Sequence, residues 1–329
     1  MIEFRNVSKH YQGAAKPAVD NFSLEIYDGE IAVFVGPSGC GKTTCMKMTN
    51  RLIEPTGGEI LLDGTNNRTL NQTELRRGIG YAIQQIGLFP HRSIASNIAT
   101  VPRLLGWDKK RIADRVDELL DLVGLDPDTY RGRYPSELSG GQQQRVGVAR
   151  ALAAAPPVML MDEPFGAVDP IARQRLQQQF LEIQARVRKT IIFVTHDIDE
   201  AILMGDRIAV LQEGGILAQY DRPEKLLTEP SSEFVADFVG ADRAIKRLSL
   251  TLCADCDLEP VSGDGQNLPR VAEHETARDA LSIMLAAGTE RAVVVSAEGE
   301  RRGTVSEGTI RALFRTEVAE EQGARGGSA

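Results

Sequence analysis

The feature that most constrains this chain is a glycine-rich segment between an apolar run and a helical pattern. Residues 31–35 are all apolar, residues 36–43 read GPSGCGKT, and a helical pattern begins at Lys42. The segment matches the phosphate-loop pattern GxxxxGK[ST], which is specific when a strand precedes it and a helix follows it. The sequence therefore predicts a strand, a phosphate-binding loop and a helix in this order.

Each residue type in the loop has a chemical reason to be there. Glycines let backbone amides turn toward phosphate oxygens, and the following helix adds the positive end of its dipole. We expect Lys42 to reach the terminal phosphates and the Thr43 hydroxyl to ligate Mg²⁺. The predicted binding residues of the loop are Gly36, Pro37, Ser38, Gly39, Cys40, Gly41, Lys42, Thr43 and Thr44.

Two more buried strands end in polar side chains. Residues 158–161 run into Asp162 and Glu163, and residues 190–194 run into Thr195 and His196. Apolar strands that alternate with helices indicate a parallel sheet with helices on its faces. The fold class that we expect is therefore α/β.

The acidic pair after residues 158–161 supplies carboxylates, which the phosphate loop lacks. Asp162 is expected to hold a carboxylate near the Mg²⁺ ion. Glu163, one residue beyond the strand, can accept a proton from a water that attacks the terminal phosphate. The alternative is that both residues only cap a buried strand.

The segment LSGGQ at residues 138–142 stands directly before a helical pattern. A serine and two glycines at the start of a helix form an anion site with exposed amides. The chain's own phosphate loop already accounts for one nucleotide, so we expect this second site to complete the nucleotide site of a partner. Its predicted binding residues are Ser139, Gly140, Gly141 and Gln142.

The patterns predict a large first domain and a small second one. Residues 1–242 form the first domain, in which residues 88–155 are a mainly helical insertion with helices at 108–123 and 142–155. Residues 243–267 are expected to be a linker, rich in Asp, Gly, Ser and Pro over 253–269. Residues 268–315 form a compact α+β unit with helices at 276–287 and 307–314 and strands at 291–296 and 302–305. Residues 316–329 are expected to be a mobile tail.

Composition limits the partners and the location. The chain has 329 residues and a net charge of −8, which gives no general attraction to nucleic-acid phosphates. No apolar run approaches the roughly 20 residues that span a bilayer, and no signal-peptide pattern follows Met1. The four cysteines fall in no disulfide framework. We expect a cytoplasmic protein with reduced thiols and no nucleic-acid partner.

Together these motifs resemble those of the ATP-binding-cassette ATPases. The resemblance covers about residues 1–240 and rests on the phosphate loop, LSGGQ, the Asp162–Glu163 strand end, FGAVD at 165–169, THD at 195–197 and Gln84. It implies a phosphate-loop NTPase cassette with a helical subdomain, which binds ATP with Mg²⁺. In that family two cassettes enclose two ATP molecules head to tail, so the resemblance implies a functional homodimer.

The resemblance also assigns roles to residues for which the motifs alone indicate none. Gln84 would contact Mg²⁺ and the attacking water, and His196 would contact the terminal phosphate, so that Glu163, His196 and Gln84 form the implied catalytic set. Asp169 would cross the dimer interface, and Tyr11 would stack on adenine. Residues 89–91 (FPH) would help to receive a coupling helix of a membrane subunit, although His91 remains open as a plain surface residue.

Two further resemblances concern the kind of transporter and the second domain. Residues 36–56 and 83–91 look like those of importers of quaternary amines such as glycine betaine, carnitine and choline. This likeness implies permease subunits as partners and, indirectly, a substrate-binding protein. It also implies that this chain itself lies at the cytoplasmic face of the cell membrane as a peripheral protein. Residues 268–315 resemble one cystathionine-beta-synthase-type (CBS) repeat, with Thr309 where nucleotide-binding repeats often have aspartate. Dimerisation, ionic-strength sensing and a spacer role all remain open for it.

Other interpretations compete at two places. A soluble cassette ATPase that acts on nucleic acid or ribosomes is the alternative function, but such relatives usually carry two cassettes or interrupted ones, and this chain has one uninterrupted cassette. Cys253 and Cys256 have metal-like spacing, with His274 as the nearby extra candidate ligand. A structural zinc site normally needs four ligands, so we expect neither metal nor redox chemistry there.

Overall fold

The computed structural model describes residues 1–82, 87–166, 170–260 and 268–314. Gln84, Asp169 and the predicted tail lie outside the described residues. The chain divides into two compact units, of which unit 1 is formed by residues 1–226 and 230–238 and unit 2 by residues 227–229 and 239–329. The domain limits that the sequence suggested remain predictions.

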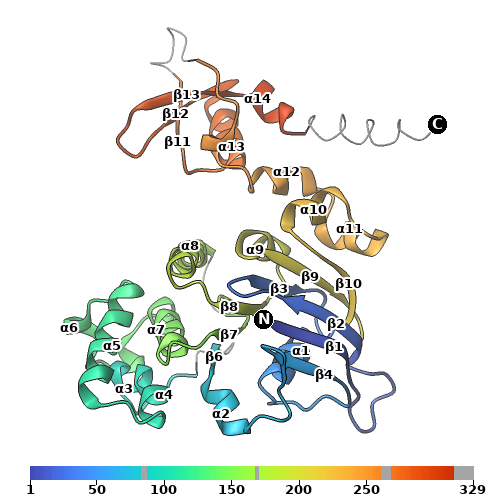
Figure 1. The fold of residues 1–329 in the computed structure, drawn as a ribbon. Coiled ribbons are helices and arrows are strands. Elements are labelled where there is room, and N and C mark those ends of the chain that lie inside the picture. Colours follow the sequence, from blue (N-terminus) through green and yellow to red (C-terminus); the bar gives the residue numbers. More distant parts are fainter. Residues whose placement is uncertain (83–86, 167–169, 261–267, 315–329) are drawn as a thin grey trace. The chain divides into compact units, whose positions relative to one another are not determined.

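A six-stranded sheet forms the centre of unit 1 (Figure 1). Its strand order is β10-β9-β3-β8-β7-β6. The adjacent strands β3, β8, β7 and β6 are parallel to one another, and β9 is parallel to β3. The edge strand β10 is antiparallel to β9. The bounds are β3 Ile31–Val35, β6 Ile79–Ala82, β7 Val158–Asp162, β8 Thr190–Val194, β9 Arg207–Gln212 and β10 Ile216–Asp221. All residues of β3 and β8 are buried, as expected for central strands covered on both faces.

A second, four-stranded sheet packs in the same unit with the order β2-β1-β4-β5. Its strands are antiparallel and span β1 Ile2–Lys9, β2 Val19–Ile26, β4 Gly57–Leu62 and β5 Thr65–Asn66. The core between the sheets contains Phe4 and Phe22 from this sheet and Phe34 from β3, with edge-to-face ring centroids 5.2–6.2 Å apart. The helix α1 (Lys42–Thr49) contributes Cys45, Met46 and Met48 to the same core.

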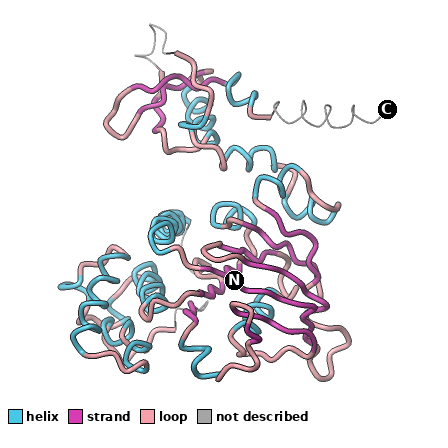
Figure 2. The backbone as a smooth tube through the Cα atoms, viewed as in Figure 1, coloured by secondary structure: helices cyan, strands magenta, loops and turns pink. Residues whose placement is uncertain are grey.

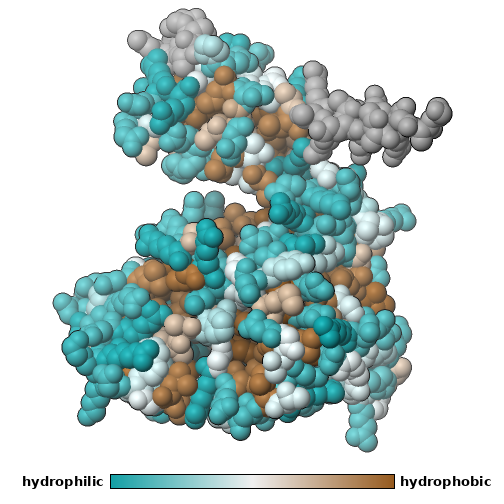
Figure 3. Space-filling model, viewed as in Figure 1, coloured by the Kyte–Doolittle hydropathy of each residue, from teal (hydrophilic) through white to brown (hydrophobic). Residues whose placement is uncertain are grey.

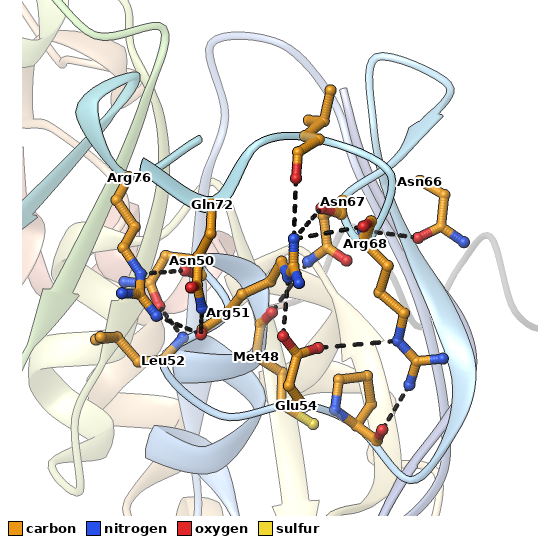
Figure 4. A network of polar contacts seen from close by, with 12 residues as sticks. Met48, Asn50, Arg51, Leu52, Glu54, Asn66, Asn67, Arg68, Gln72 and Arg76 are labelled. Carbon is orange, nitrogen blue, oxygen red and sulfur yellow. Dashed lines mark hydrogen bonds and ion pairs between the residues drawn. The ribbon is translucent and has the colours of Figure 1, made fainter. Parts of the chain in front are cut away.

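The carboxyl end of α1 is held by side chains from a distant part of the chain (Figure 4). Asn67 Nδ2 donates to the carbonyl oxygens of Met48 and Thr49, and the guanidinium of Arg76 on α2 (Gln72–Arg77) donates to those of Asn50 and Arg51. The last carbonyls of a helix lack the full set of helical partners, and these side chains add hydrogen bonds to them. The helix that begins with the phosphate loop is thereby fixed at its other end.

Most of the remaining helices of unit 1 gather beside the edge strand β6 (Figure 2). Their bounds are α3 Ile94–Ile98, α4 Thr100–Leu104, α5 Lys109–Leu122, α6 Pro127–Tyr130 and α7 Gly140–Leu152, with a 3₁₀ turn at Pro135–Glu137. The predicted helices at 108–123 and 142–155 correspond to α5 and α7. The helix α7 starts two residues earlier than predicted, because Ser139 caps it and both glycines belong to its first turn.

The helices α8 Pro170–Val187 and α9 Ile198–Met204 follow the strands β7 and β8 of the central sheet. The helix α10 Pro223–Thr228 follows β10 and contains residues of both units, and α11 Glu233–Val239 comes after it. In one view the surface is mostly hydrophilic with smaller hydrophobic patches (Figure 3). No helix among the described residues is both long and apolar enough to span a membrane.

Unit 2 contains a three-stranded sheet with the order β11-β12-β13. The strands β11 Arg270–Ala272 and β12 Arg291–Val295 are parallel and are joined through α13 Ala277–Ala287, whereas β13 Arg301–Ser306 is antiparallel to β12. The elements α12 Arg243–Leu248, a 3₁₀ turn at Cys253–Asp255 and α14 Glu307–Ala312 complete it. The strand β11 was not predicted, because three residues are too short a run for a periodic pattern.

Candidate functional site

The predicted site residues follow neighbouring parallel strands. β3, β8, β7 and β6 are adjacent in the sheet, so their carboxyl ends lie at one edge. The phosphate loop follows β3, Asp162 and Glu163 stand at the end of β7, and His196 comes two residues after β8. Ligands of open α/β sheets bind outside this edge.

The backbone of the phosphate loop requires glycine at two positions. Gly36 has φ +152° and Gly41 has φ +111°, conformations that residues with a Cβ rarely adopt. A Cβ on Gly36 would lie 2.3 Å from the carbonyl oxygen of Leu211, and one on Gly41 would lie 2.5 Å from that of Ala18. The loop therefore packs directly on neighbouring backbone, and other residues at these positions would displace it.

Lys42 lies inside the curve of the loop. Its ammonium donates to the carbonyl oxygens of Gly36 at 2.7 Å and Pro37 at 2.9 Å, and the residue is 6% exposed. The Cys40 thiol lies 3.8 Å from the same nitrogen. A buried cation held by loop carbonyls is placed to exchange them for phosphate oxygens.

Thr43 and Asp162 meet at the start of α1. The Thr43 hydroxyl donates to Asp162 Oδ1 at 2.9 Å, and Lys47 Nζ lies 3.8 Å from Asp162 Oδ2. Burial raises the pKa of Asp162, and the Thr43 hydrogen bond and the charge of Lys47 oppose that rise. A hydroxyl and a carboxylate oxygen side by side are hard ligands of the type that Mg²⁺ prefers, so the donor set fits this ion.

Lys47 was missed by the sequence analysis. It lies four residues after Thr43 on α1, and residues at this spacing share one face of a helix. This spacing could have identified Lys47, because a lysine on the same helix face as Thr43, the expected Mg²⁺ ligand, is expected to lie close to Asp162.

Glu163 and His196 come together across adjacent strands. His196 Nδ1 lies 3.2 Å from Glu163 Oε1, while the backbone N–H of Glu163 donates to the Val194 carbonyl at 2.9 Å. Glu163 has φ +45°, a left-handed conformation that is costly for this residue type. Such strain is found most often at functional sites, where the surrounding structure enforces it.

The LSGGQ segment forms the capped start of α7. Ser139 Oγ accepts from the Gln142 N–H at 3.3 Å, and Gln142 Oε1 accepts from the Ser139 N–H at 3.0 Å. This reciprocal pair satisfies two of the free amides of the first turn. A Cβ on Gly140 would meet no atom within 4 Å, so packing within this chain gives no reason for a glycine there.

Of the remaining predicted residues, those that the structure describes are exposed. Tyr11 is 42% exposed, and Lys9 Nζ lies 5.0 Å from the centre of its ring. Phe89 and His91 are exposed, with ring centres 6.2 Å apart. Gln84 and Asp169, which complete the predicted set, lie outside the described residues.

Cys253 and Cys256 lie in the apolar core of unit 2. Their thiols face the carbonyl oxygens of Thr276 and Leu252 at 3.4 and 3.5 Å. Burial raises the pKa of Cys253 to about 12 and also raises the pKa of Cys256. Both side chains therefore pack as small apolar groups in their thiol form.

Curated proteins match most of this chain. Osmoprotectant import ATP-binding protein OsmV of Salmonella typhimurium is 55% identical over 258 residues, which are 78% of this chain and 67% of that protein. Glycine betaine uptake system ATP-binding protein YehX of Escherichia coli is 49% identical over 306 residues, 93% of this chain and 97% of that protein. Choline transport ATP-binding protein OpuBA of Bacillus subtilis is also 49% identical, over 93% of this chain and 78% of that protein.

Solved structures and a family profile agree with these relatives. The ABC transporter family matches residues 19–166. A dimeric post-hydrolysis state of an ATP-binding cassette bound to ADP and Pi has a TM-score of 0.60 and 33% identity, and covers 68% of this chain and 98% of that one. The phosphate-loop cassette fold expected from the sequence is thus confirmed. This chain belongs to the ABC transporter family and is an ATPase of that family.

Proposed function

We propose that this chain energises a membrane importer of quaternary amine osmoprotectants such as glycine betaine, carnitine or choline. The observation that carries the proposal is the match to YehX, a glycine betaine uptake protein, over nearly the whole of both chains. The other close relatives are named for osmoprotectant, choline or carnitine transport. They favour transport over a soluble cassette ATPase that acts on nucleic acid or ribosomes.

We assign each residue a chemical role from its position or from the family resemblance. Backbone amides of the phosphate loop and Lys42 bind the terminal phosphates of ATP. Glu163 accepts a proton from the attacking water, and His196 keeps the Glu163 carboxylate oriented through their 3.2 Å contact while it faces the terminal phosphate. Gln84 and Asp169 are assigned to the water and to the dimer interface by family resemblance. Tyr11 stacks on adenine.

Thr43 and Asp162, with Gln84, would hold Mg²⁺. The ion would offset the negative charge of the phosphates when it is bound. The chain's own contribution is to keep a hydroxyl and a carboxylate together at 2.9 Å where β7 meets α1. Lys47, 3.8 Å from the other carboxylate oxygen, favours the ionised form of Asp162 because its charge lowers the pKa of that group.

The partners that we propose are a second copy of the chain and permease subunits. Dimeric cassettes are known for the related solved structures. The open space at Gly140 supports a contact with a partner's nucleotide rather than with this chain. The complex would lie at the cytoplasmic face of the membrane, with residues 268–315 as a CBS-like unit that dimerises, senses ionic strength or acts as a spacer.

Ser139→Arg is expected to block ATP-driven dimerisation while the monomer still binds ATP. A long cation at the start of α7 would fill the space that the partner's phosphates need, whereas the phosphate loop lies elsewhere in the chain. Light scattering with ATP measures the dimer, and fluorescence of a labelled nucleotide measures binding. Equal loss of both would contradict the role of LSGGQ in the partner's site.

Transport tests the whole proposal. The chain, purified with its permease subunits, is reconstituted in vesicles with ATP and offered labelled glycine betaine, choline, carnitine or, as a control, an uncharged sugar. We expect ATP-dependent uptake of a quaternary amine and none with the Lys42→Ala complex. Failure to copurify any membrane subunit from detergent-solubilised membranes, or uptake of the sugar alone, would overturn the proposal.

A further inference from the structure

A buried polar contact joins the helix that follows the FGAVD segment to the turn that carries His196. Gln177 lies on α8 and Glu200 lies in the first turn of α9, and Gln177 Nε2 donates to Glu200 Oε1 at 2.9 Å. The residues are 6% and 8% exposed. A carboxyl group buried to this extent is costly unless hydrogen bonds compensate, so the contact must be satisfied to persist.

Hydrogen bonds connect Glu200 through Asp197 to Thr195, the residue before His196. Thr195 is 1% exposed, and its hydroxyl also lowers the pKa of the Glu200 carboxyl. Thr195 Oγ1 accepts from the Asp197 N–H at 3.1 Å, and the Asp197 carboxylate accepts from the Glu200 N–H at 3.2 Å. Thr195, Asp197 and Glu200 are thus linked in series across the turn that contains His196, and Gln177 links Glu200 to α8.

We propose that Glu200 and Gln177 are positioning residues that hold the His196 turn against α8 and so keep His196 in line with Glu163. The inference rests on the proposed role of His196 at the terminal phosphate. His196 itself is exposed, with 59% of its side chain accessible, so few contacts of its own fix its direction. Its alignment must come from the backbone turn, and the buried pair fixes that turn.

The charges around the pair define what a substitution does. Burial raises the pKa of Glu200, while the Thr195 and Gln177 hydrogen bonds lower it. Asp197 at the start of α9 raises this pKa further, and Arg173 on α8 lowers it. The Gln177 amide donates to the Glu200 carboxyl group. A glutamate at position 177 would have no such N–H donor, so the two carboxyl groups would have to share a proton to stay hydrogen-bonded.

Gln177→Glu is therefore expected to make ATP hydrolysis dependent on pH. At low pH the two carboxyl groups share one proton and the turn keeps its place, whereas that proton is lost as pH rises and two negative charges then repel each other. From about pH 5 to about pH 9 we expect kcat to fall by roughly ten- to a hundredfold relative to the parent, with little change in KM for ATP. Steady-state kinetics on the full chain, with melting temperatures at each pH, measures this.

Two variants separate positioning from a general effect of a buried carboxyl. The double variant Gln177→Glu/Glu200→Gln restores one amide and one carboxyl, so it should recover the parental pH profile. Gln184→Glu adds a carboxyl at another buried position of α8, where the amide contacts the carbonyls of Gly29 and Lys189. It should lower the melting temperature without making kcat fall with pH.

The outcomes distinguish this inference from the proposed function. If His196→Ala keeps the parental kcat, the proposed role of His196 is wrong. If His196→Ala loses activity while folded Gln177→Glu keeps the parental pH profile, the positioning role alone is overturned. A double variant that folds but keeps the pH dependence of Gln177→Glu would also overturn it.

Discussion

Glu163→Gln is expected to slow ATP hydrolysis by roughly a hundred- to ten-thousandfold while ATP binding is retained. The substitution preserves the size of the side chain beside His196 but removes the carboxylate that we propose takes the proton of the attacking water. The backbone at this position, at φ +45°, aims the side chain beyond the end of β7 and is not altered by the change. In the proposed head-to-tail dimer, slower hydrolysis should let ATP-bound dimers accumulate.

Size-exclusion chromatography with Mg²⁺ and ATP detects that dimer, and a single-turnover assay measures the slowed step. Asp162→Asn provides the matched control. The Asp162 carboxylate is next to Glu163 in sequence but contacts Thr43, whereas Glu163 contacts His196. The control should weaken Mg²⁺-dependent binding and turnover together and should not trap a dimer. Near-parental hydrolysis by Glu163→Gln in a contaminant-controlled assay would show that another group, such as His196 or the phosphate itself, activates the water.

Lys42→Ala should abolish turnover and weaken ATP binding by roughly tenfold or more, because a hydrogen bond to a charged group contributes about 1.5–3 kcal/mol. The parent residue carries the cation at the centre of the phosphate loop, where its ammonium reaches two loop carbonyls within 2.9 Å. The variant leaves neutral amides to hold a highly charged ligand. Titration with a fluorescent ATP analogue and a phosphate-release assay measure the two effects.

Lys47→Ala is the control for this prediction. Lys47 is on the same helix but faces Asp162, at 3.8 Å, rather than the loop. Its removal should reduce ATP binding much less than the loss of Lys42. Equal effects of the two substitutions would mean that the general positive charge of α1, rather than the place of Lys42 in the loop, holds the phosphates.

The sequence was most informative where chemistry and strand position coincide. The strands β3 and β8 were predicted with their observed bounds, and β7 to within one residue, because their apolar runs ended abruptly at a glycine or at polar residues. The parallel order of these strands then required the phosphate loop, Asp162 and His196 to share an edge. Among the features that were not predicted, the strands β5 and β11 have only two or three residues, which carry no periodicity. The start of α7 was also misplaced, because the capping serine moves the helix boundary.

What the sequence by itself determined is the family, the loop and the residue types at the ends of the central strands, since these are local patterns within a few neighbouring residues. Only the tertiary structure decided which groups meet. The contact of Thr43 with Asp162 and the capping of α1 by Asn67 and Arg76 join distant segments. The same holds for Gln177 and Glu200, which are 23 residues apart on different helices. Such pairings depend on how helices pack against the sheet, and no spacing along the chain records that packing.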